Sequence, residues 1–254
     1  MNQNSKNALV TGASKGVGRG IAVGLAKDGW NVGVNYYKDQ AGAEATAETI
    51  QSLGQQAWVL PADVGYSDQV ETMFKQFIEL AGRIDLLVNN AGVQTWVPFI
   101  DLKESDWDRT IRTNLKGTFL CTQQAARLMK ETGGRIINIG SGANKAPFPC
   151  LSDYCASKGG IETLTTVAAV ELGRDGITIN CIAPGTIEIE RTKLEDLDYA
   201  GEWGSRTPMG RIGHVEDVAD AVVFFAGERA KFITGQTLYV DGGLWSQVPW
   251  IYDF

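Results

Sequence analysis

The chain has 254 residues, of which 44% are apolar, and it carries a formal net charge of −7 at pH 7. This length and apolar fraction suffice for one large domain with a substantial core. The acidic balance disfavours nucleic acid as a partner. The first residues lack the apolar run of a signal peptide, and no stretch reaches the roughly 18 apolar residues of a membrane helix. We therefore expect a cytoplasmic protein with no membrane partner.

Short apolar runs alternate with amphipathic segments along the chain. The runs predict strands near 7–11, 31–37, 56–62, 84–90, 134–141, 177–184 and 236–243, and the segments predict helices near 17–28, 41–53, 68–81, 105–130, 154–173 and 215–226. Val70, Met73, Phe74 and Phe77, for instance, fall on one helical face.

The strand runs are almost continuously apolar, as in a parallel sheet that is covered on both faces. The alternation predicts an α/β fold, a single-domain Rossmann-type doubly wound parallel sheet of about seven strands with helices on both faces. One domain would span 1–254. The irregular segment around 186–212 is expected to be a substrate lid, and 244–254 forms an apolar C-terminal tail.

Cysteine and histidine usage argues against a metal site. The cysteines are Cys121, Cys150, Cys155 and Cys181, and His214 is the single histidine. No CxxC pair or metal-ligand cluster results, so we expect no metal. The thiols are expected to be reduced and mostly buried.

A glycine cluster, "TGASKGVGRGIA" (11–22), follows the first predicted strand and opens the first predicted helix. Gly12, Gly16 and Gly18 would let the backbone approach a pyrophosphate at a helix N-terminus. The alternative is an ordinary glycine-rich turn, because such patterns recur by chance.

Four motifs together resemble the short-chain dehydrogenase/reductase family, in particular sugar 1-dehydrogenases and 3-oxoacyl-[acyl-carrier-protein] reductases. The motifs are TGxxxGxG, "NNAG" at 89–92, the set Ser141/Tyr154/Lys158, and "PG" at 184–185. Each is weak alone, but in this order they are highly specific, and the resemblance runs from about residue 7 to 243. It implies an NAD(P)-dependent oxidoreductase.

Tyr154 and Lys158 are four residues apart and would share one helix face. A free tyrosine titrates near about 10, and a lysine cation would lower its pKa toward the working pH. Ser141 would stabilise charge on the substrate oxygen. The resemblance adds that Lys158 binds the nicotinamide ribose and that Asn114 holds a water in the proton relay. The alternative is a surface helix pair.

The resemblance also implies the cofactor contacts. Asp63 would bind the adenine amino group, although a helix-initiating aspartate is the competing interpretation. "NNAG" would lie beside the adenosine ribose and brace the central strands. The expected cofactor residues are Gly12, Ser14, Lys15, Gly16, Val17, Gly18, Asn35, Tyr36, Tyr37, Lys38, Asp63, Val64, Asn90, Ala91, Gly92, Tyr154, Lys158, Pro184, Gly185 and Ile187.

The end of the second strand favours NADP(H), with NAD(H) possible. A carboxylate there binds the ribose 2′-hydroxyl of NAD, but Asn35 and Tyr36 occupy the expected positions. Lys15 and Lys38 offer cations for a 2′-phosphate, while Asp39 weakens the local positive field. Both lysines are alternatively plain surface charges.

The segment after "PG" departs from the family pattern, since Ile189 stands where a threonine is usual. The polar residues of this segment, among them Glu188, are equally well explained as contacts to substrate hydroxyls or as the solvated face of a short helix. A set of a tryptophan, an amide and a carboxylate would suit a sugar. The candidate substrate residues are Gln94, Trp96, Asn144, Glu188 and Trp203.

Three functions are weighed. The first is oxidation or reduction of a small polyhydroxylated substrate, such as an aldose. The second is reduction of a 3-oxoacyl thioester, whose acidic carrier protein would need a basic docking patch. Arg109, Arg112 and Lys116 lie on one predicted helix, but the resemblance places that helix at a subunit interface. The third is a non-catalytic nucleotide sensor. The resemblance further implies a homotetramer, with Trp250 and Phe254 buried between chains.

Overall fold

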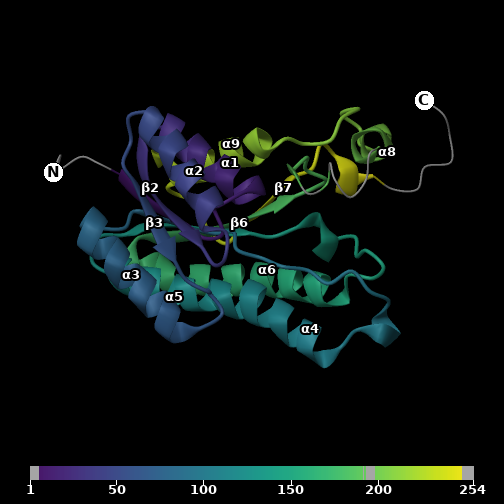
Figure 1. Cartoon of the computed structure of the whole chain (residues 1–254), viewed down its shortest axis with the longest axis horizontal. Coiled ribbons are helices and arrows are strands. Elements are labelled where there is room, and N and C mark those ends of the chain that lie inside the picture. Colours follow the sequence, from purple (N-terminus) through teal and green to yellow (C-terminus); the bar gives the residue numbers. More distant parts are fainter. Residues whose placement is uncertain (1–5, 191, 193–197, 248–254) are drawn as a thin grey trace.

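Seven parallel strands form one sheet in the order β3-β2-β1-β4-β5-β6-β7 (Figure 1). The computed structural model describes residues 6–190, 192 and 198–247. The strands are β1 Lys6–Val10, β2 Trp30–Tyr36, β3 Ala57–Pro61, β4 Leu86–Asn89, β5 Gly134–Ile139, β6 Ile177–Pro184 and β7 Thr237–Val240. All seven predicted strands and the parallel doubly wound sheet are confirmed.

Helices cover both faces of this sheet. In Figure 1, α1, α2 and α9 lie on one side, and α3, α5 and α6 lie on the other. The helices are α1 Gly16–Lys27, α2 Gln40–Ser52, α3 Ser67–Ala81, α4 Glu104–Thr110, α5 Gly117–Met129, α6 Ser152–Leu172, α8 Tyr199–Arg206 and α9 Val215–Ala226. Within the described part of the chain, none of the helices combines the length and apolarity needed to cross a bilayer.

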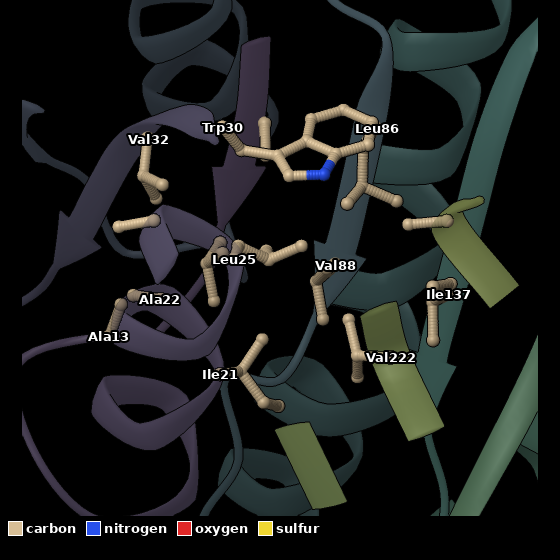
Figure 2. Packing of buried hydrophobic residues seen from close by; sticks show 14 of the residues in the cluster. Ala13, Ile21, Ala22, Leu25, Trp30, Val32, Leu86, Val88, Ile137 and Val222 are labelled. Atoms are coloured by element: carbon tan, nitrogen blue, oxygen red, sulfur yellow. The ribbon is translucent and has the colours of Figure 1, made fainter. Parts of the chain in front are cut away.

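The core has two halves, one on each face of the sheet. Alternation along β1 sends Ala8 and Val10 to the side of α1 and α9, and Leu9 to the side of α3 and α5. Figure 2 shows the first half, where Ile21 of α1 lies near Val222 of α9. In the second half, the predicted apolar face of α3 is confirmed, since Val70, Met73, Phe74 and Phe77 are each at most 2% exposed. Burying such a side chain fully stabilises the fold by roughly 1.5–3 kcal/mol.

Two segments differ from the expected elements. The helix predicted over 105–130 is interrupted by a π-helical turn, Ile111–Lys116, between α4 and α5. The segment expected to be irregular contains the helix α8. Hydrogen bonds between distant residues hold the π turn, as described below, and helical periodicity carries no signal for such bonds.

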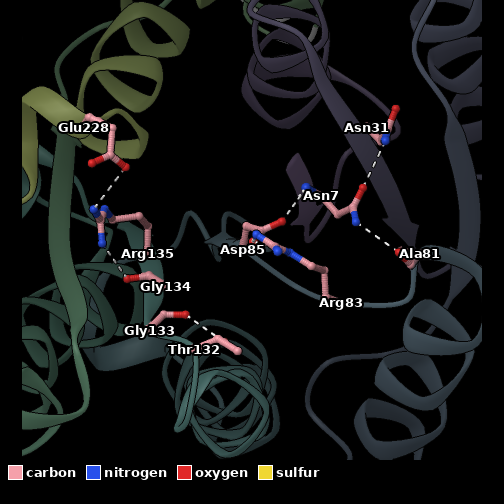
Figure 3. A network of polar contacts seen from close by, with 10 residues as sticks. All are labelled: Asn7, Asn31, Ala81, Arg83, Asp85, Thr132, Gly133, Gly134, Arg135 and Glu228. Carbon is pink, nitrogen blue, oxygen red and sulfur yellow. Dashed lines mark hydrogen bonds and ion pairs between the residues drawn. The ribbon is translucent and has the colours of Figure 1, made fainter. Parts of the chain in front are cut away.

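Polar side chains fix the amino-terminal ends of the strands (Figure 3). The backbone N–H of Asn7 donates to Asp85 at 2.9 Å, and the Asn31 amide donates to Asn7 at 3.0 Å. On β5, Arg135 lies 3.9 Å from Glu228. The predicted functional residues follow the opposite, carboxyl ends of the strands, so this network supports the sheet at the edge away from the candidate site.

Candidate active site

The predicted motifs come together at the carboxyl ends of β1, β4, β5 and β6. The strand order reverses between β1 and β4, which are hydrogen-bonded neighbours, because the chain crosses from β3 at one edge of the sheet to β4 beside β1. At such a switch point the connections leave in opposite directions and open a crevice that binds ligands in doubly wound folds. The glycine cluster, "NNAG", Ser141 and "PG" all border this edge.

The glycine cluster forms a cradle that side chains would fill. Gly12 has φ +63°, and a Cβ on it would lie 2.9 Å from the Ala91 Cα. A Cβ on Gly18 would lie 2.3 Å from the Gly12 carbonyl oxygen. Helix α1 begins at Gly16 with no side-chain cap from Lys15 and no acidic residue in its first turn. Its first N–H groups are therefore suited to an anion, and the residues fit a dinucleotide pyrophosphate.

"NNAG" braces the glycine cluster. The Asn90 amide donates to the carbonyl oxygens of Thr11 at 2.9 Å and Gly12 at 3.1 Å. In return, the Thr11 hydroxyl accepts from the backbone N–H groups of Asn90 and Ala91 at 2.9 and 3.0 Å. The motif therefore holds the loop after β1 against the end of β4.

Asn35 lies elsewhere than expected for a group that faces the ribose. Asn35 is 1% exposed. Its side-chain amide donates to the carbonyl oxygens of Leu60 and Ala62, and its amide oxygen accepts from the backbone N–H of Gly12 at 3.1 Å. The amide thus holds β3 to the glycine loop.

Tyr37 is 59% exposed and the Lys38 ammonium lies 5.1 Å from its ring centroid. Lys15 is also exposed, so both candidate cations are at the surface.

Asp63 is buried in the turn between β3 and α3, and the residue that caps α3 is Tyr66. Asp63 is 7% exposed, and its Oδ1 accepts from the Gly65 backbone N–H at 2.9 Å. This bond shapes the turn before α3. Val64 beside it is 4% exposed and packs in the core.

Lys158 and Tyr154 lie together on α6, as the spacing predicts. Lys158 is 4% exposed, and its Nζ donates to the carbonyl oxygen of Ile139 at 2.6 Å. The same Nζ lies 5.6 Å from the centroid of the Tyr154 ring. A buried cation beside the phenol is the arrangement that favours a phenolate.

Burial lowers the pKa of Lys158 from 10.5 to about 8, and a negatively charged Cys181 would oppose that shift. Burial also raises the pKa of Cys181 to about 11, so the thiol is neutral at pH 7 and gives no opposition there. With its pKa at about 8, Lys158 is mostly protonated at neutral pH.

Ser141 follows β5 and begins a short turn, Gly142–Asn144. Its Oγ accepts from the Ala143 backbone N–H at 3.2 Å. A serine hydroxyl also carries one proton to donate, so Ser141 has the chemistry to hold a substrate oxygen.

Asn114 is fully buried on the π turn. Its Oδ1 accepts from the Val93 N–H at 2.8 Å, and its Nδ2 donates to the Val93 carbonyl oxygen and to the Ser157 hydroxyl, each at 2.9 Å. The side chain is thus engaged with protein on both ends. A relay water at this residue would have to be held by the backbone oxygen.

An aromatic cluster borders Ser141. The Phe148 ring packs edge-on against Trp203 of α8 at 5.6 Å and against Trp245 at 5.3 Å between ring centroids. The Trp245 indole lies so close to Gly142 that a Cβ there would come within 1.8 Å of its Nε1. Helix α8, the segment that follows Ser141 and the turn at 244–246 therefore contribute to one aromatic wall.

The predicted substrate residues are not all gathered at this wall. Trp203 is part of it. The Asn144 amide instead donates to Glu162 of α6, and Glu188 lies 4.0 Å from His214 at the start of α9. Trp96 is 66% exposed. The backbone carbonyl oxygen of Gln94 accepts a hydrogen bond from the Arg109 guanidinium at 3.5 Å.

Glu188 also borders a hollow of about 620 Å³ between α1 and α9. This hollow shares Gly16 with the glycine cradle, but its lining does not include Ser141, Tyr154 or Lys158. We therefore place the candidate active site at the motif residues and not at this hollow.

The cysteines are free thiols; Cys121 and Cys181 are buried, and Cys150 and Cys155 are half-buried. The expectation of mostly buried thiols thus holds for two of them. Over residues 6–190, 192 and 198–247, no group of three or more histidine, cysteine, aspartate or glutamate side chains is arranged to hold a metal ion.

Sequence reasoning missed Phe148 and Trp245 in the wall, and the hydrogen-bonded pair of Thr110 on α4 and Asp153 on α6. Phe148 could have been found from its position between Ser141 and Tyr154. Trp245 could have been found as the aromatic residue that directly follows "YVDGGL". No local pattern marks Thr110 as a partner of Asp153.

Comparisons with known proteins agree with this geometry. A family model described as enoyl-(acyl carrier protein) reductase matches residues 12–245. The chain is 40% identical over 242 residues to the 3-oxoacyl-[acyl-carrier-protein] reductase FabG of Staphylococcus aureus (strain N315), covering 95% of this chain and 98% of that protein. It is 40% identical over 243 residues to the (2S)-[(R)-hydroxy(phenyl)methyl]succinyl-CoA dehydrogenase subunit BbsD of Thauera aromatica, covering 93% and 95%.

Among solved structures, acetoin dehydrogenase YohF from Salmonella typhimurium matches with a TM-score of 0.88 and 35% identity, covering 98% of this chain and 99% of that chain. The chain belongs to the short-chain dehydrogenase/reductase family, whose members are NAD(P)-dependent oxidoreductases that act on CH-OH groups. The named substrates of the three relatives differ, so they agree on the reaction class alone.

Proposed function

We propose that this protein transfers hydride between NADP(H) and a small alcohol or carbonyl substrate, with a sugar or polyol as the favoured class. The single observation that carries the proposal is the buried Lys158 ammonium, 5.6 Å from the Tyr154 ring centroid. A surface helix pair would leave this lysine solvated, whereas here it is 4% exposed.

In this proposal Tyr154 is the acid–base group. It protonates the developing alkoxide in reduction, and its phenolate takes the alcohol proton in oxidation. The Lys158 cation beside the ring would favour the phenolate form. Ser141 donates to the substrate oxygen and stabilises the charge that develops there. Asn114 supports the relay by fixing the π turn against α6.

The glycine cradle and the free N–H groups of α1 would hold the pyrophosphate, and Asp63 the adenine. Ser14, Val17, Asn90, Ala91 and Gly92 would line the same cradle, and Pro184, Gly185 and Ile187 would border the nicotinamide. When bound, the nicotinamide supplies or accepts the hydride. Lys15, Tyr37 and Lys38 would select NADP(H) through its 2′-phosphate, a role that their surface positions support.

The aromatic wall supports a ring-shaped substrate. Phe148 packs against Trp203 and Trp245, and Trp245 lies against Gly142, the residue after Ser141. A sugar combines an apolar ring face, which packs on aromatic side chains, with hydroxyl edges that bond to polar groups.

Reduction of a 3-oxoacyl thioester is the second candidate, favoured by the 40% identity to FabG. The basic patch expected for a carrier protein is weakened in the structure. Arg112 and Lys116 lie within the π turn, which changes their helical spacing from Arg109, and the Arg112 guanidinium lies 5.1 Å from the Tyr66 ring centroid. Arg109 donates to the Thr95 hydroxyl at 3.0 Å.

A panel assay of reduced-nicotinamide absorbance tests the proposal. It presents aldoses, polyols, ketoses and a 3-oxoacyl thioester, each with NADP(H) and NAD(H). We expect turnover with a sugar or polyol and NADP(H). Turnover confined to the thioester would select the second candidate, and no turnover with any carbonyl or alcohol would contradict the reaction itself.

We further propose a homotetramer of one-domain subunits. Two exposed apolar faces suit two-fold contacts: Val167 and Val170 of α6 are 53% and 86% exposed, and Phe224 and Phe232 near β7 are 44% and 101% exposed. Trp250 and Phe254, expected at an interface, lie outside the described residues. Size-exclusion chromatography with light scattering tests the assembly, and a monomeric mass would contradict it.

A further inference from the structure

A buried carboxylate precedes the candidate catalytic tyrosine. Asp153 is 0% exposed. Its Oδ2 accepts from the Thr110 hydroxyl at 2.7 Å, and its Oδ1 accepts from the Tyr154 backbone N–H at 2.7 Å. Burying a carboxylate is costly unless it is hydrogen-bonded, and here both oxygens have donors.

The position of Asp153 lowers that cost further. It lies in the first turn of α6, which begins at Ser152. The N-terminus of a helix favours negative charge. The site is therefore built to keep a carboxylate at this residue, immediately before Tyr154.

A second contact joins the same two segments one helical turn further along α6. The Asn114 amide donates to the Ser157 hydroxyl at 2.9 Å, and that hydroxyl donates to the Tyr154 carbonyl oxygen at 2.7 Å. Thr110 and Ser157 are both 0% exposed. Two buried polar contacts, Thr110–Asp153 and Asn114–Ser157, therefore flank Tyr154 and tie α6 to α4 and the π turn.

We propose that Asp153, held by Thr110, is a positioning residue that fixes the first turn of α6 and so aims the Tyr154 phenol at the substrate oxygen beside Ser141. This inference rests on the proposed role of Tyr154. The Thr110 hydroxyl bonds to a charged acceptor, which is the stronger class of hydrogen bond. A small displacement of a catalytic group, of about 1 Å, costs on the order of 10²-fold in rate.

The test compares Thr110→Val, which keeps the shape and removes the hydroxyl, with Thr110→Ser, which keeps the hydroxyl. The substrate is the one found active in the panel. The rate is divided by the concentration of NADPH-binding sites, which is measured from NADPH fluorescence, so that unfolded protein is not counted. We expect Thr110→Val to lower kcat by roughly 10-fold or more, with KM and NADPH affinity within about 2-fold of the parent. Thr110→Ser should recover most of kcat. Asp153→Asn, which keeps an acceptor for Thr110, should lower kcat by less than Asp153→Ala does.

The Tyr154→Phe background separates positioning from simple support of the fold. If Thr110 acts through the phenol, adding Thr110→Val to Tyr154→Phe should cause little further loss, because residues that act as a unit are non-additive. An equal loss in both backgrounds, or a parent-like kcat per NADPH site for Thr110→Val, would overturn the inference. Full activity of Tyr154→Phe alone would instead refute the proposed function, and the positioning role with it.

Discussion

Lys158 donates a 2.6 Å hydrogen bond to the carbonyl oxygen of Ile139, which joins the middle of α6 to the end of β5. Ser141 follows two residues after Ile139, and Tyr154 precedes Lys158 by one helical turn. One buried contact therefore relates the cation, the phenol and the serine hydroxyl to each other.

The buried charge of Lys158 should reduce stability at neutral pH. Its pKa is lowered from 10.5 to about 8 in the folded chain. Below pH 8 both folded and unfolded chains hold the proton, so the burial penalty is fully present. Between pH 8 and 10.5 the unfolded chain binds more protons, so the free energy of unfolding contributed by this group rises with pH.

Lys158→Met removes this penalty. We expect the variant to be more stable than the parent at pH 7, by about 1–3 kcal/mol given the size of the shift, and catalytically impaired. Urea unfolding at pH 7 and pH 9.5 measures the difference, which should shrink at the higher pH. A variant less stable than the parent at pH 7 would show that the Ile139 hydrogen bond outweighs the desolvation of the charge.

Removing the two surface cations near the cradle should change cofactor selection. Lys15→Ala combined with Lys38→Ala should weaken NADPH binding by about 10-fold or more, since hydrogen bonds to charged groups are worth roughly 1.5–3 kcal/mol. NADH binding should change little. Titration of cofactor fluorescence gives both affinities, and Lys27→Ala, at the far end of α1, is the matched control. Equal weakening of NADPH and NADH would contradict the assignment.

A methyl group on Gly18 should close the cradle. Its Cβ would lie 2.3 Å from the Gly12 carbonyl oxygen and 2.4 Å from the Asn90 amide nitrogen. Gly18→Ala should therefore weaken both cofactors and lower the melting temperature. Gly159→Ala on α6 is the control, because a Cβ there meets nothing within 4 Å; it should leave binding unchanged and stabilise by about 0.5–1 kcal/mol. Unaltered cofactor affinity in Gly18→Ala would count against the cradle.

The contact between Gly142 and Trp245 should control the substrate pocket. Gly142→Ala would place its Cβ within 1.8 Å of the indole nitrogen, so Trp245 must move away from the Ser141 loop. We expect a higher KM for the best panel substrate and unchanged NADPH affinity. Tryptophan emission reports the displacement. An unchanged KM together with altered emission would place the wall outside the substrate site.

Periodicity and motif order predicted the strands and most helices, because apolar spacing determines which faces are buried. They also placed Tyr154 and Lys158 on one helix face. Contacts between distant residues carried no local signal. The π turn depends on Asn114 meeting Val93 and Ser157, and the burial of Asn35 depends on its bonds to Gly12, Leu60 and Ala62. Pairs such as Thr110–Asp153 become visible only when the fold brings the helices together.

Tyr154→Phe tests the central claim most directly, since it removes the phenol proton and keeps the ring. We measure kcat/KM with the best panel substrate and the dissociation constant of NADPH, side by side with the parent. General acid–base groups contribute about 10²–10⁴-fold, so kcat/KM should fall by that order while NADPH affinity stays within about 2-fold. A variant that retains parent-like kcat/KM with the same NADPH affinity would contradict the role of Tyr154.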